Sequence, residues 1–276
     1  MEQSESTRVL VIDNGTGYIK AGFAGDEEPR VVFSTVIGRR SRSLSSGPVD
    51  PNEKEHYIGH EALRRNFLQR RYPIESGIIK NFDEMEKIWH HTFYNELSVA
   101  PEEYSVLLTV SPWNTNNIRE KMAQTMFETF MTRGIHISIS AVLLLNLSGN
   151  STGVVVDSGD GATSIVPIHQ GKILAEPQKV QLTGVDLTDY LTKILTERGY
   201  WFTLDYTSRE IARDMKENLC YVAQDYNYWD DINSYLMPEN LARNYETLNG
   251  NVLAVGKNKT ILLLCIITFG RLTQLL

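Results

Sequence analysis

The sequence predicts an α/β fold made of two similar halves, and three observations support this prediction. A strand, a tight loop rich in Asp and Gly, and a second strand occur near residue 13 and again near residue 157. Strand and helix patterns alternate on both sides of a Gly/Ser/Asn cluster at residues 146–152, which is typical of right-handed α/β units. The chain has 276 residues, which is enough for one large or two ordinary domains.

The first strand-loop-strand segment spans residues 9–23. Its apolar strand ends in Asp13, and Gly15 and Gly17 follow in the loop. Glycines allow sharp turns and a close backbone approach to a ligand, and successive backbone N–H groups can cradle a phosphate. An acidic side chain at a strand end can hold the water shell of Mg²⁺, and Lys20 can neutralise phosphate charge. The segment therefore predicts a phosphate-binding hairpin.

The second segment, residues 153–168, repeats this pattern. Residues 154–156 are β-branched and apolar, so we expect a strand that is covered on both faces. Asp157, Gly159 and Gly161 follow in the loop. One such segment alone is also typical of an ordinary hairpin. Two of them favour paired loops that hold the β- and γ-phosphates of a nucleotide from both sides of a shared cleft. The chain has no GxxxxGK[ST] motif, so the phosphates would lie on hairpins rather than at a helix N-terminus.

Longer stretches carry a resemblance to a known family. The clearest are residues 81–97, 100–103, 119–122, 187–191 and 194–200. Together with the two hairpins they closely resemble actin over about residues 9–256, within the superfamily that includes sugar kinases and the Hsp70 ATPases. The resemblance implies the actin-like ATPase fold, with ribonuclease H-like halves around a nucleotide cleft. It also implies an ATP-binding cytoskeletal protein that serves as a filament subunit.

The resemblance implies a site for ATP or ADP with Mg²⁺ or Ca²⁺. One group of residues would hold the phosphates from the first hairpin: Asp13, Asn14, Gly15, Thr16, Gly17, Tyr18 and Lys20. A second group would hold them from the other hairpin: Asp157, Gly159, Asp160 and Gly161. Asp13 and Asp157 would fix the cation through water. A third group would face adenine and ribose: Gly184, Arg213, Lys216 and Glu217. For the last three, a solvated charged helix face is the alternative.

Two replacements bear on catalysis. The family has a water-orienting glutamine where this chain has Ser140, and a histidine where it has Ser164. Serine reaches less far than either side chain, and water-positioning groups contribute much of the catalysis of phosphoryl transfer. We therefore expect slow hydrolysis and assign no catalytic residue, with a rearranged water network as the alternative.

Two further departures bear on assembly. The expected mobile loop has a polar tip at residues 43–51, in which Leu44 and Val49 are the apolar anchors. Beyond residue 256 the chain no longer resembles actin, so we expect a C-terminally truncated fold with an unrelated apolar tail at 257–276. The expected origin is a truncated or frame-altered gene, and a tail that docks on the exposed core is the alternative. We therefore doubt self-assembly.

These patterns predict a domain plan and a set of elements. The first half is 1–150 with a small mobile-loop subdomain at 36–71, and the second is 151–256 with a small helical subdomain at 185–256. Helices are expected at 61–71, 82–96, 116–130, 186–199 and 207–222, and strands at 31–37 and 103–109.

The composition of the chain indicates in which compartment the protein works and which classes of partner it can bind. The net charge of −7 argues against nucleic-acid binding. The apolar run at 261–269 is too short to span a bilayer, and residues 1–7 lack the apolar core of a signal peptide. Cys220 and Cys265 form no disulfide framework. We expect a cytoplasmic, cytoskeletal protein whose partners are actin and actin-binding proteins. The alternatives are a non-polymerising actin-related binding module and a non-functional truncated product.

Overall fold

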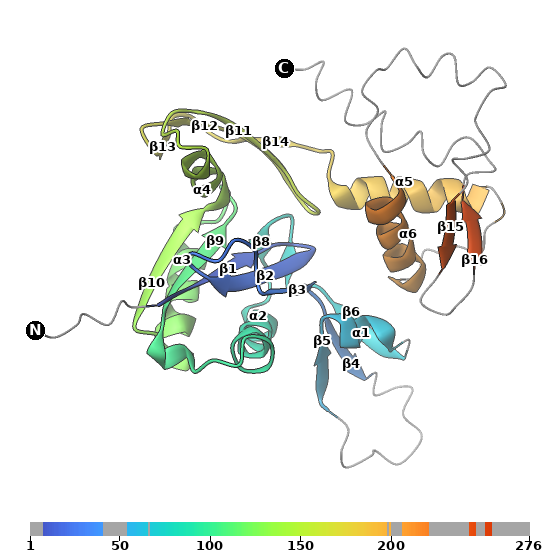
Figure 1. The fold of residues 1–276 in the computed structure, drawn as a ribbon, viewed down its shortest axis with the longest axis horizontal. Coiled ribbons are helices and arrows are strands. Elements are labelled where there is room, and N and C mark those ends of the chain that lie inside the picture. The colour runs from blue at the N-terminus through green and yellow to red at the C-terminus, as the bar shows by residue number, and fades with distance from the viewer. Residues whose placement is uncertain are drawn as a thin grey trace, which may run out of the picture. The chain divides into compact units, whose positions relative to one another are not determined.

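The structure is a computed structural model, and it describes residues 8–40, 54–65, 67–197, 199, 206–220, 243–246 and 252–255. The chain divides into two compact units, 1–181 and 182–276, and each is described here by itself (Figure 1). Both predicted phosphate hairpins belong to the first unit. The predicted boundary at residue 150 lies inside that unit, and the division into halves stays a prediction. The loop tip at 43–51 and the tail at 257–276 lie outside the described residues.

A five-stranded mixed sheet forms the centre of the first unit. Its strands, in spatial order, are β10 (Gly134–Ile139), β9 (Ser105–Val110), β1 (Val9–Asn14), β2 (Tyr18–Phe23) and β3 (Val31–Ser34). Strands β9 and β10 run parallel to β1, whereas β2 and β3 are antiparallel to their neighbours. The loop between β1 and β2 and the end of β9 therefore lie at the same edge of the sheet, where ligands of α/β proteins bind.

Two helices pack on this sheet. They are α2 (Phe82–His90), which continues as the π-helical turn η1 (His91–Glu96), and α3 (Asn116–Gln124), which continues as η3 (Thr125–Thr129). The helices expected at 82–96 and 116–130 are therefore present, although their last turns are π-helical. The side chain of Asn81 caps α2 by accepting the N–H of Glu84 at 3.1 Å. The predicted inward residues Met85, Ile88 and Trp89 are fully buried in the shared core.

A small three-stranded sheet is inserted after β3. It consists of β5 (His56–Ile58), β4 (Ile37–Arg40) and β6 (Leu68–Arg71), with α1 (His60–Arg64) beside it. The helix expected at 61–71 is wrong beyond Arg64, because Leu68–Arg71 alternate between buried and exposed and pair with β4. Buried Arg70 donates to the carbonyls of Ala62 and Leu63 and so satisfies acceptors in the last turn of α1. The strand expected at 31–37 is split into β3 and β4.

Short elements connect these parts of the first unit. They are the strands β7 (Ile74–Glu75) and β8 (Ile78–Ile79), which form a two-stranded hairpin, and the 3₁₀ helix η2 (Pro101–Glu103). The turn between β7 and β8 contains Ser76 and Gly77, both of which have positive φ angles.

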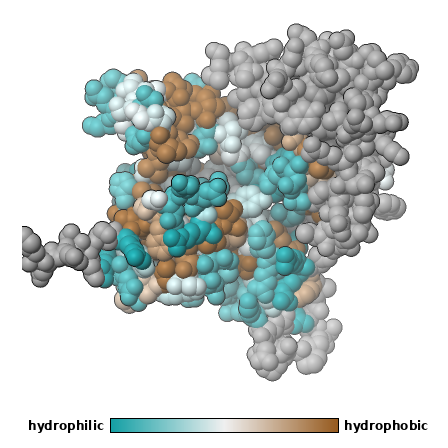
Figure 2. Space-filling view, in the orientation of Figure 1, coloured by the Kyte–Doolittle hydropathy of each residue, from teal (hydrophilic) through white to brown (hydrophobic). Residues whose placement is uncertain are grey.

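A second sheet carries the second hairpin. It contains β11 (Gly153–Ser158), β12 (Thr163–His169), β13 (Lys172–Ile173) and β14 (Gln178–Val180). Its inner face packs on helix α4 (Ser140–Leu147), where Ala141, Leu145 and Val166 are buried. On the outer face Val154 is 63% exposed and Val156 is 42% exposed. The expectation of a strand covered on both faces is therefore wrong, and apolar side chains gather over this hairpin and α4 (Figure 2).

The second unit is built on two helices, α5 (Gly184–Glu197) and α6 (Tyr206–Leu219). Leu191 and Leu195 of α5 pack against Ala212 and Met215 of α6. Two strands, β15 (Arg243–Glu246) and β16 (Val252–Val255), form an antiparallel pair. Within the described part of the chain, no helix is both long and apolar enough to cross a membrane.

Candidate nucleotide site

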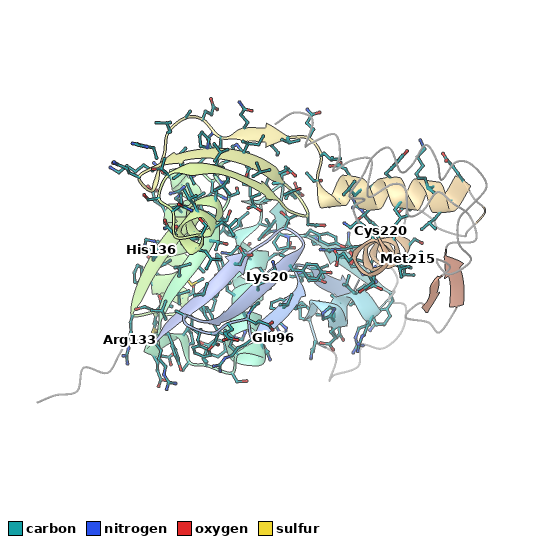
Figure 3. The ribbon with its side chains drawn as sticks, turned by 45° about the horizontal axis from the view of Figure 1, so that its top comes forward. Lys20, Glu96, Arg133, His136, Met215 and Cys220 are labelled. Carbon is teal, nitrogen blue, oxygen red and sulfur yellow. The ribbon has the colours of Figure 1, made fainter. Side chains whose placement is uncertain are left out.

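A cavity of about 590 Å³ lies between the two hairpin loops of the first unit. The residues that the two hairpins contribute are Asp13, Asn14, Gly15, Thr16, Gly17, Tyr18, Lys20, Asp157, Ser158, Gly159, Asp160, Gly161 and Ala162. Lys20 lies on β2 (Figure 3). The structure thus brings together all the predicted phosphate-side residues, although they lie in two distant segments of the sequence. Their roles toward a nucleotide stay predictions.

The two loops touch each other at Gly161. A Cβ atom added to Gly161 would lie 2.5 Å from the Cγ2 atom of Thr16, which is too close for any real contact. Only glycine therefore allows this approach of the second loop to the first. A Cβ atom at Gly15 would likewise collide with the carbonyl oxygen of Tyr18. The two glycines fix how closely the hairpins approach each other and how tightly the first one turns.

The first loop is anchored through its carbonyl groups. The hydroxyl of Thr35 donates to the carbonyl of Gly15 at 2.8 Å, and the N–H of Thr35 donates to the carbonyl of Gly17 at 3.0 Å. Because the peptide unit is planar and trans, the N–H of the residue after each carbonyl points away from Thr35. Thr35 therefore sets the orientation of the loop peptides that line the cavity.

The turn at Ser76–Gly77 forms a second anchor. The N–H of Gly77 donates to the hydroxyl of Thr16 at 2.9 Å, and the side chain of Asn114 donates to the carbonyl of Gly77 at 3.0 Å. Gly77 has a φ of +76°, and a Cβ atom there would lie 2.9 Å from the side chain of Ser111. Both the backbone conformation and the close packing require glycine at this position.

Thr109, at the end of β9, holds the start of the loop. Its hydroxyl donates to Asp13 Oδ1 at 2.5 Å and accepts the backbone N–H of Asn14 at 3.0 Å. The side chain of Asn14 donates to the Thr109 carbonyl at 3.1 Å and accepts the indole N–H of Trp89 at 2.9 Å. Asn14 lines the cavity, but its polar atoms serve these internal bonds. The sequence offered one signal for Thr109, a hydroxyl that follows three apolar residues near the end of the strand.

Two interactions within the second hairpin shape its loop. The N–H of Gly159 donates to the carbonyl of Ala162 at 2.8 Å, and the hydroxyls of Ser158 and Thr163 are 2.9 Å apart. Both interactions lie within the hairpin itself. From another element, the hydroxyl of Ser140 lies 3.3 Å from Asp157 Oδ2. Ser140, the first residue of α4, therefore lies beside Asp157.

The two serines of interest for catalysis differ in position. Ser140 lines the cavity and contacts Asp157. Ser164 is buried on β12 directly opposite Asp157 in the sheet register, and it is not among the described residues that line the cavity. Of these two serines, only Ser140 therefore lines the cavity.

Four predicted site residues belong to the second unit, and the structure places them in two pairs. The ammonium of Lys216 donates to the carbonyl of Gly184 at 2.8 Å and contacts the hydroxyl of Thr188 at 3.0 Å. The Nε of Arg213 donates to Glu217 at 3.2 Å. Only 8% of the Arg213 side chain is exposed, so the alternative of a solvated charged face does not hold for this arginine. That these residues face adenine and ribose stays a prediction.

The residues around the first cavity fit a polyphosphate with a hydrated divalent cation. Neither Asp13 nor Asp157 forms an ion pair with a described Lys or Arg, so both carboxylates keep oxygen atoms for a cation. No cluster of three or more His, Cys, Asp or Glu side chains suited to a metal ion occurs among the described residues. This arrangement suits a cation held through its water shell. The cavity volume lies in the range of small-molecule sites.

One comparison with known proteins agrees with this arrangement. The family sequence model described as Actin matches residues 4–262. Members of this family generally bind a nucleotide with a divalent cation and are generally cytoskeletal. The mixed sheet, its helices and the paired hairpins are consistent with an actin-like fold. The match covers most of the chain, and the protein therefore belongs to the actin family.

Proposed function

We propose that this protein is an ATP-binding cytoskeletal protein of the actin type, which binds ATP or ADP with Mg²⁺ or Ca²⁺ between its two hairpins. The observation that carries the proposal is the single cavity lined by both loops and both aspartates. Folding alone does not require two segments that are far apart in the sequence to place their carboxylates and glycine-rich turns around one cavity. Membership of the actin family supports the same assignment.

Each group in the cavity has a role that its chemistry suits. The peptide N–H groups of the two loops would bind phosphate oxygens, and Lys20 would neutralise part of their charge. Asp13 and Asp157 would accept hydrogen bonds from the water shell of the cation, which supplies positive charge beside the phosphates. Thr109 and Ser140 hold these two carboxylates by hydrogen bonds.

Hydrolysis should be slow in this site. Attack on a terminal phosphate needs a water molecule held in line, and groups that hold it contribute much of the catalysis. Ser140 lines the cavity beside Asp157, and its short side chain is already bonded to that carboxylate. A Ser140→Gln variant should raise the rate of phosphate release by at least about tenfold. An unchanged rate would mean that another group positions the water.

Binding is tested by calorimetric titration with ATP and Mg²⁺. Asp13→Asn and Asp157→Asn should each weaken binding at least about tenfold, because each removes a negative charge that faces the cation. Asp26→Asn is the matched control, since Asp26 pairs with Arg30 at the exposed turn before β3 and does not line the cavity. Equal affinity in all four proteins would contradict the proposed site.

The second candidate is a non-polymerising module that binds actin or actin-binding proteins. The exposed apolar residues Val154 and Val156 favour it, because apolar patches on a protein surface often mark association sites. Pelleting of the purified protein with ATP and Mg²⁺, alone and with actin, separates the two candidates. Filaments formed by the protein alone indicate a filament subunit, whereas pelleting only with actin indicates a binding module.

A further inference from the structure

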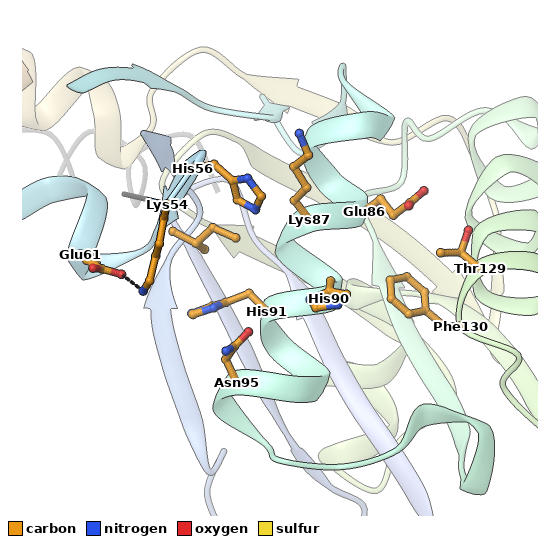
Figure 4. Close-up of a pocket in the computed structure, with 11 residues that line it drawn as sticks. Lys54, His56, Glu61, Glu86, Lys87, His90, His91, Asn95, Thr129 and Phe130 are labelled. Carbon is orange, nitrogen blue, oxygen red and sulfur yellow. Dashed lines mark hydrogen bonds and ion pairs between the residues drawn. The ribbon is translucent and has the colours of Figure 1, made fainter. Parts of the chain in front are cut away.

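A second cavity, of about 350 Å³, lies in the first unit between the small inserted sheet and helix α2 (Figure 4). None of its lining residues lines the nucleotide cavity. Three imidazoles and two ammonium groups line it, together with two carboxylates, an amide, a hydroxyl and two apolar side chains. These residues are His56, His90, His91, Lys54, Lys87, Glu61, Glu86, Asn95, Thr129, Ile58 and Phe130.

Two buried nitrogen atoms on the small inserted sheet have no hydrogen-bond partner among the described residues. They are Nδ1 of His56, which lines the cavity, and Nε of the neighbouring Arg39. The two residues are cross-strand partners on β5 and β4, so their side chains lie on the same face of the small sheet. Buried polar atoms in folded proteins are nearly always bonded to protein or to a bound molecule. The unpaired atoms therefore indicate that a partner is missing beside the cavity.

The charges around His56 favour an anion as that partner. The pKa of His56 is lowered, first by burial and then by the positive charge of Lys87; Arg39 and His90 lower it further, and Glu55 opposes them. Lys87 has no ion pair with any residue that the structure describes. A bound anion would compensate this accumulated positive potential.

The two carboxylates of the lining do not offset this charge at His56. Glu61 is already paired with Lys54 at 2.9 Å and with Arg65 at 3.2 Å. Glu86 points away from the side of the cavity that His56 occupies (Figure 4). The cavity is therefore basic on the side of His56 and Lys87, and mixed on the side of Phe130.

The other residues that line the cavity indicate the chemical nature of the rest of the ligand. Ile58 and Phe130 are apolar, and Phe130 is fixed by edge contact with Phe93 at 5.1 Å between ring centroids. Asn95 adds an amide that can donate or accept a hydrogen bond. A phosphate group has three oxygen atoms that can accept bonds from imidazole, ammonium and amide donors. The apolar wall leaves room for a small ring or aliphatic group.

We propose that this cavity is a binding site for a small organic phosphate monoester, with the phosphate between His56, Lys87 and His90 and the organic group against Phe130. The site lies outside the nucleotide cavity and is independent of it. Phosphate binding should strengthen when His56 gains a proton, because a protonated imidazole donates from both nitrogens. The bound phosphate should in turn raise the pKa of His56.

Nuclear magnetic resonance of the histidine side chains tests the proposal, with phenyl phosphate as the probe. The resonances of His56 and His90 should shift on titration and the pKa of His56 should rise. His136, on β10 (Figure 3), should not respond. Inorganic phosphate should bind more weakly, and benzyl alcohol should cause no comparable shift. Equal binding of phenyl phosphate and inorganic phosphate would overturn the assignment of the organic group.

Matched variants locate the binding. Lys87→Met and His56→Gln should each weaken phenyl phosphate binding at least tenfold. Lys172→Met, at the end of β13, and His136→Gln remove the same side-chain types away from the cavity and should leave the affinity unchanged. Circular dichroism checks that all four variants fold. The proposal is wrong if the folded Lys87→Met and His56→Gln variants bind phenyl phosphate as tightly as the unaltered protein does.

Discussion

The two phosphate hairpins have the same local sequence pattern but are supported very differently. In the first hairpin Leu10 and Ile12 are fully buried in the five-stranded sheet, and its loop is bonded to Thr35 and Thr109 from other elements. In the second hairpin two bonds join residues of the loop to each other, and the outer face of β11 is exposed at Val154.

This difference shows that the local sequence determines the shape of each hairpin, whereas the rest of the chain determines how rigidly the hairpin is held. Aspartate and glycines are enough to turn both hairpins the same way. Rigidity comes largely from packing, and the apolar side chains of β1 are buried more fully than those of β11. The second hairpin, whose strand β11 is exposed on its outer face, should therefore open more readily. We infer that the first hairpin is the fixed wall of the cavity and the second is the adaptable one.

The largest effect should follow from removing the aromatic support of the first hairpin. Trp89 is fully buried, packs in the main core and donates to Asn14. Trp89→Ala should lower the free energy of unfolding by about 3–5 kcal/mol, because it leaves a large cavity and an unpaired amide. Urea titration followed by circular dichroism measures this loss. A loss below about 1 kcal/mol would mean that the first hairpin is not the rigid one.

The second effect concerns the contact between the hairpins. Gly161→Ala places a methyl group against Thr16, so one loop must shift at a cost of about 1–3 kcal/mol. Because β11 is exposed on its outer face, the second loop should be the one that moves, and Mg²⁺-ATP affinity should fall about tenfold. Gly153→Ala, at the other end of β11, meets only a methyl group of Leu145 and is the control. Calorimetric titration of both variants distinguishes a specific loop contact from a general effect of added volume.

Much of this architecture could be predicted from the sequence, since it depends on local patterns. The helices at 82–96 and 116–130 and their buried residues follow from apolar spacing. The meeting of the loops at one cavity was expected from the repeated motif and the family resemblance. The strand at Leu68–Arg71 was missed, because a mixture of arginine and apolar residues in a short segment fits either a helix or a strand.

The supports of the site could not be predicted in the same way. Thr109 bonds to Asn14 across 95 positions of sequence, and Gly77 bonds to Thr16 across 61. Such long-range bonds produce no periodic pattern in the sequence. A threonine in a strand is also common for reasons unrelated to a binding site. The exposed face of β11 was also missed, because an apolar strand has the same sequence whether one face or both are covered.

A third effect compares the two hydroxyls that hold the aspartates. Thr109→Val keeps the shape of the side chain but removes the hydroxyl bonded to Asp13 and Asn14, and should cost about 1–3 kcal/mol of stability. Ser140→Ala removes one longer bond to Asp157 and should cost about 0.5 kcal/mol. Thermal and urea unfolding of both variants measure the contrast. Equal losses would show that both aspartates are held equally firmly.

The smallest effect is expected on the outer face of β11, where neighbouring residues of one strand provide their own control. Val154 is exposed, so Val154→Thr should change the free energy of unfolding by no more than about 0.5 kcal/mol. Val155, next to it, packs against the buried cluster of α4, so Val155→Thr buries a hydroxyl and should cost about 1–3 kcal/mol. Val154→Thr should also reduce self-association in light scattering, because it makes an exposed apolar face more polar. If Val154→Thr destabilised the protein as much as Val155→Thr, the outer face would be covered in solution, and the second hairpin would be supported as fully as the first.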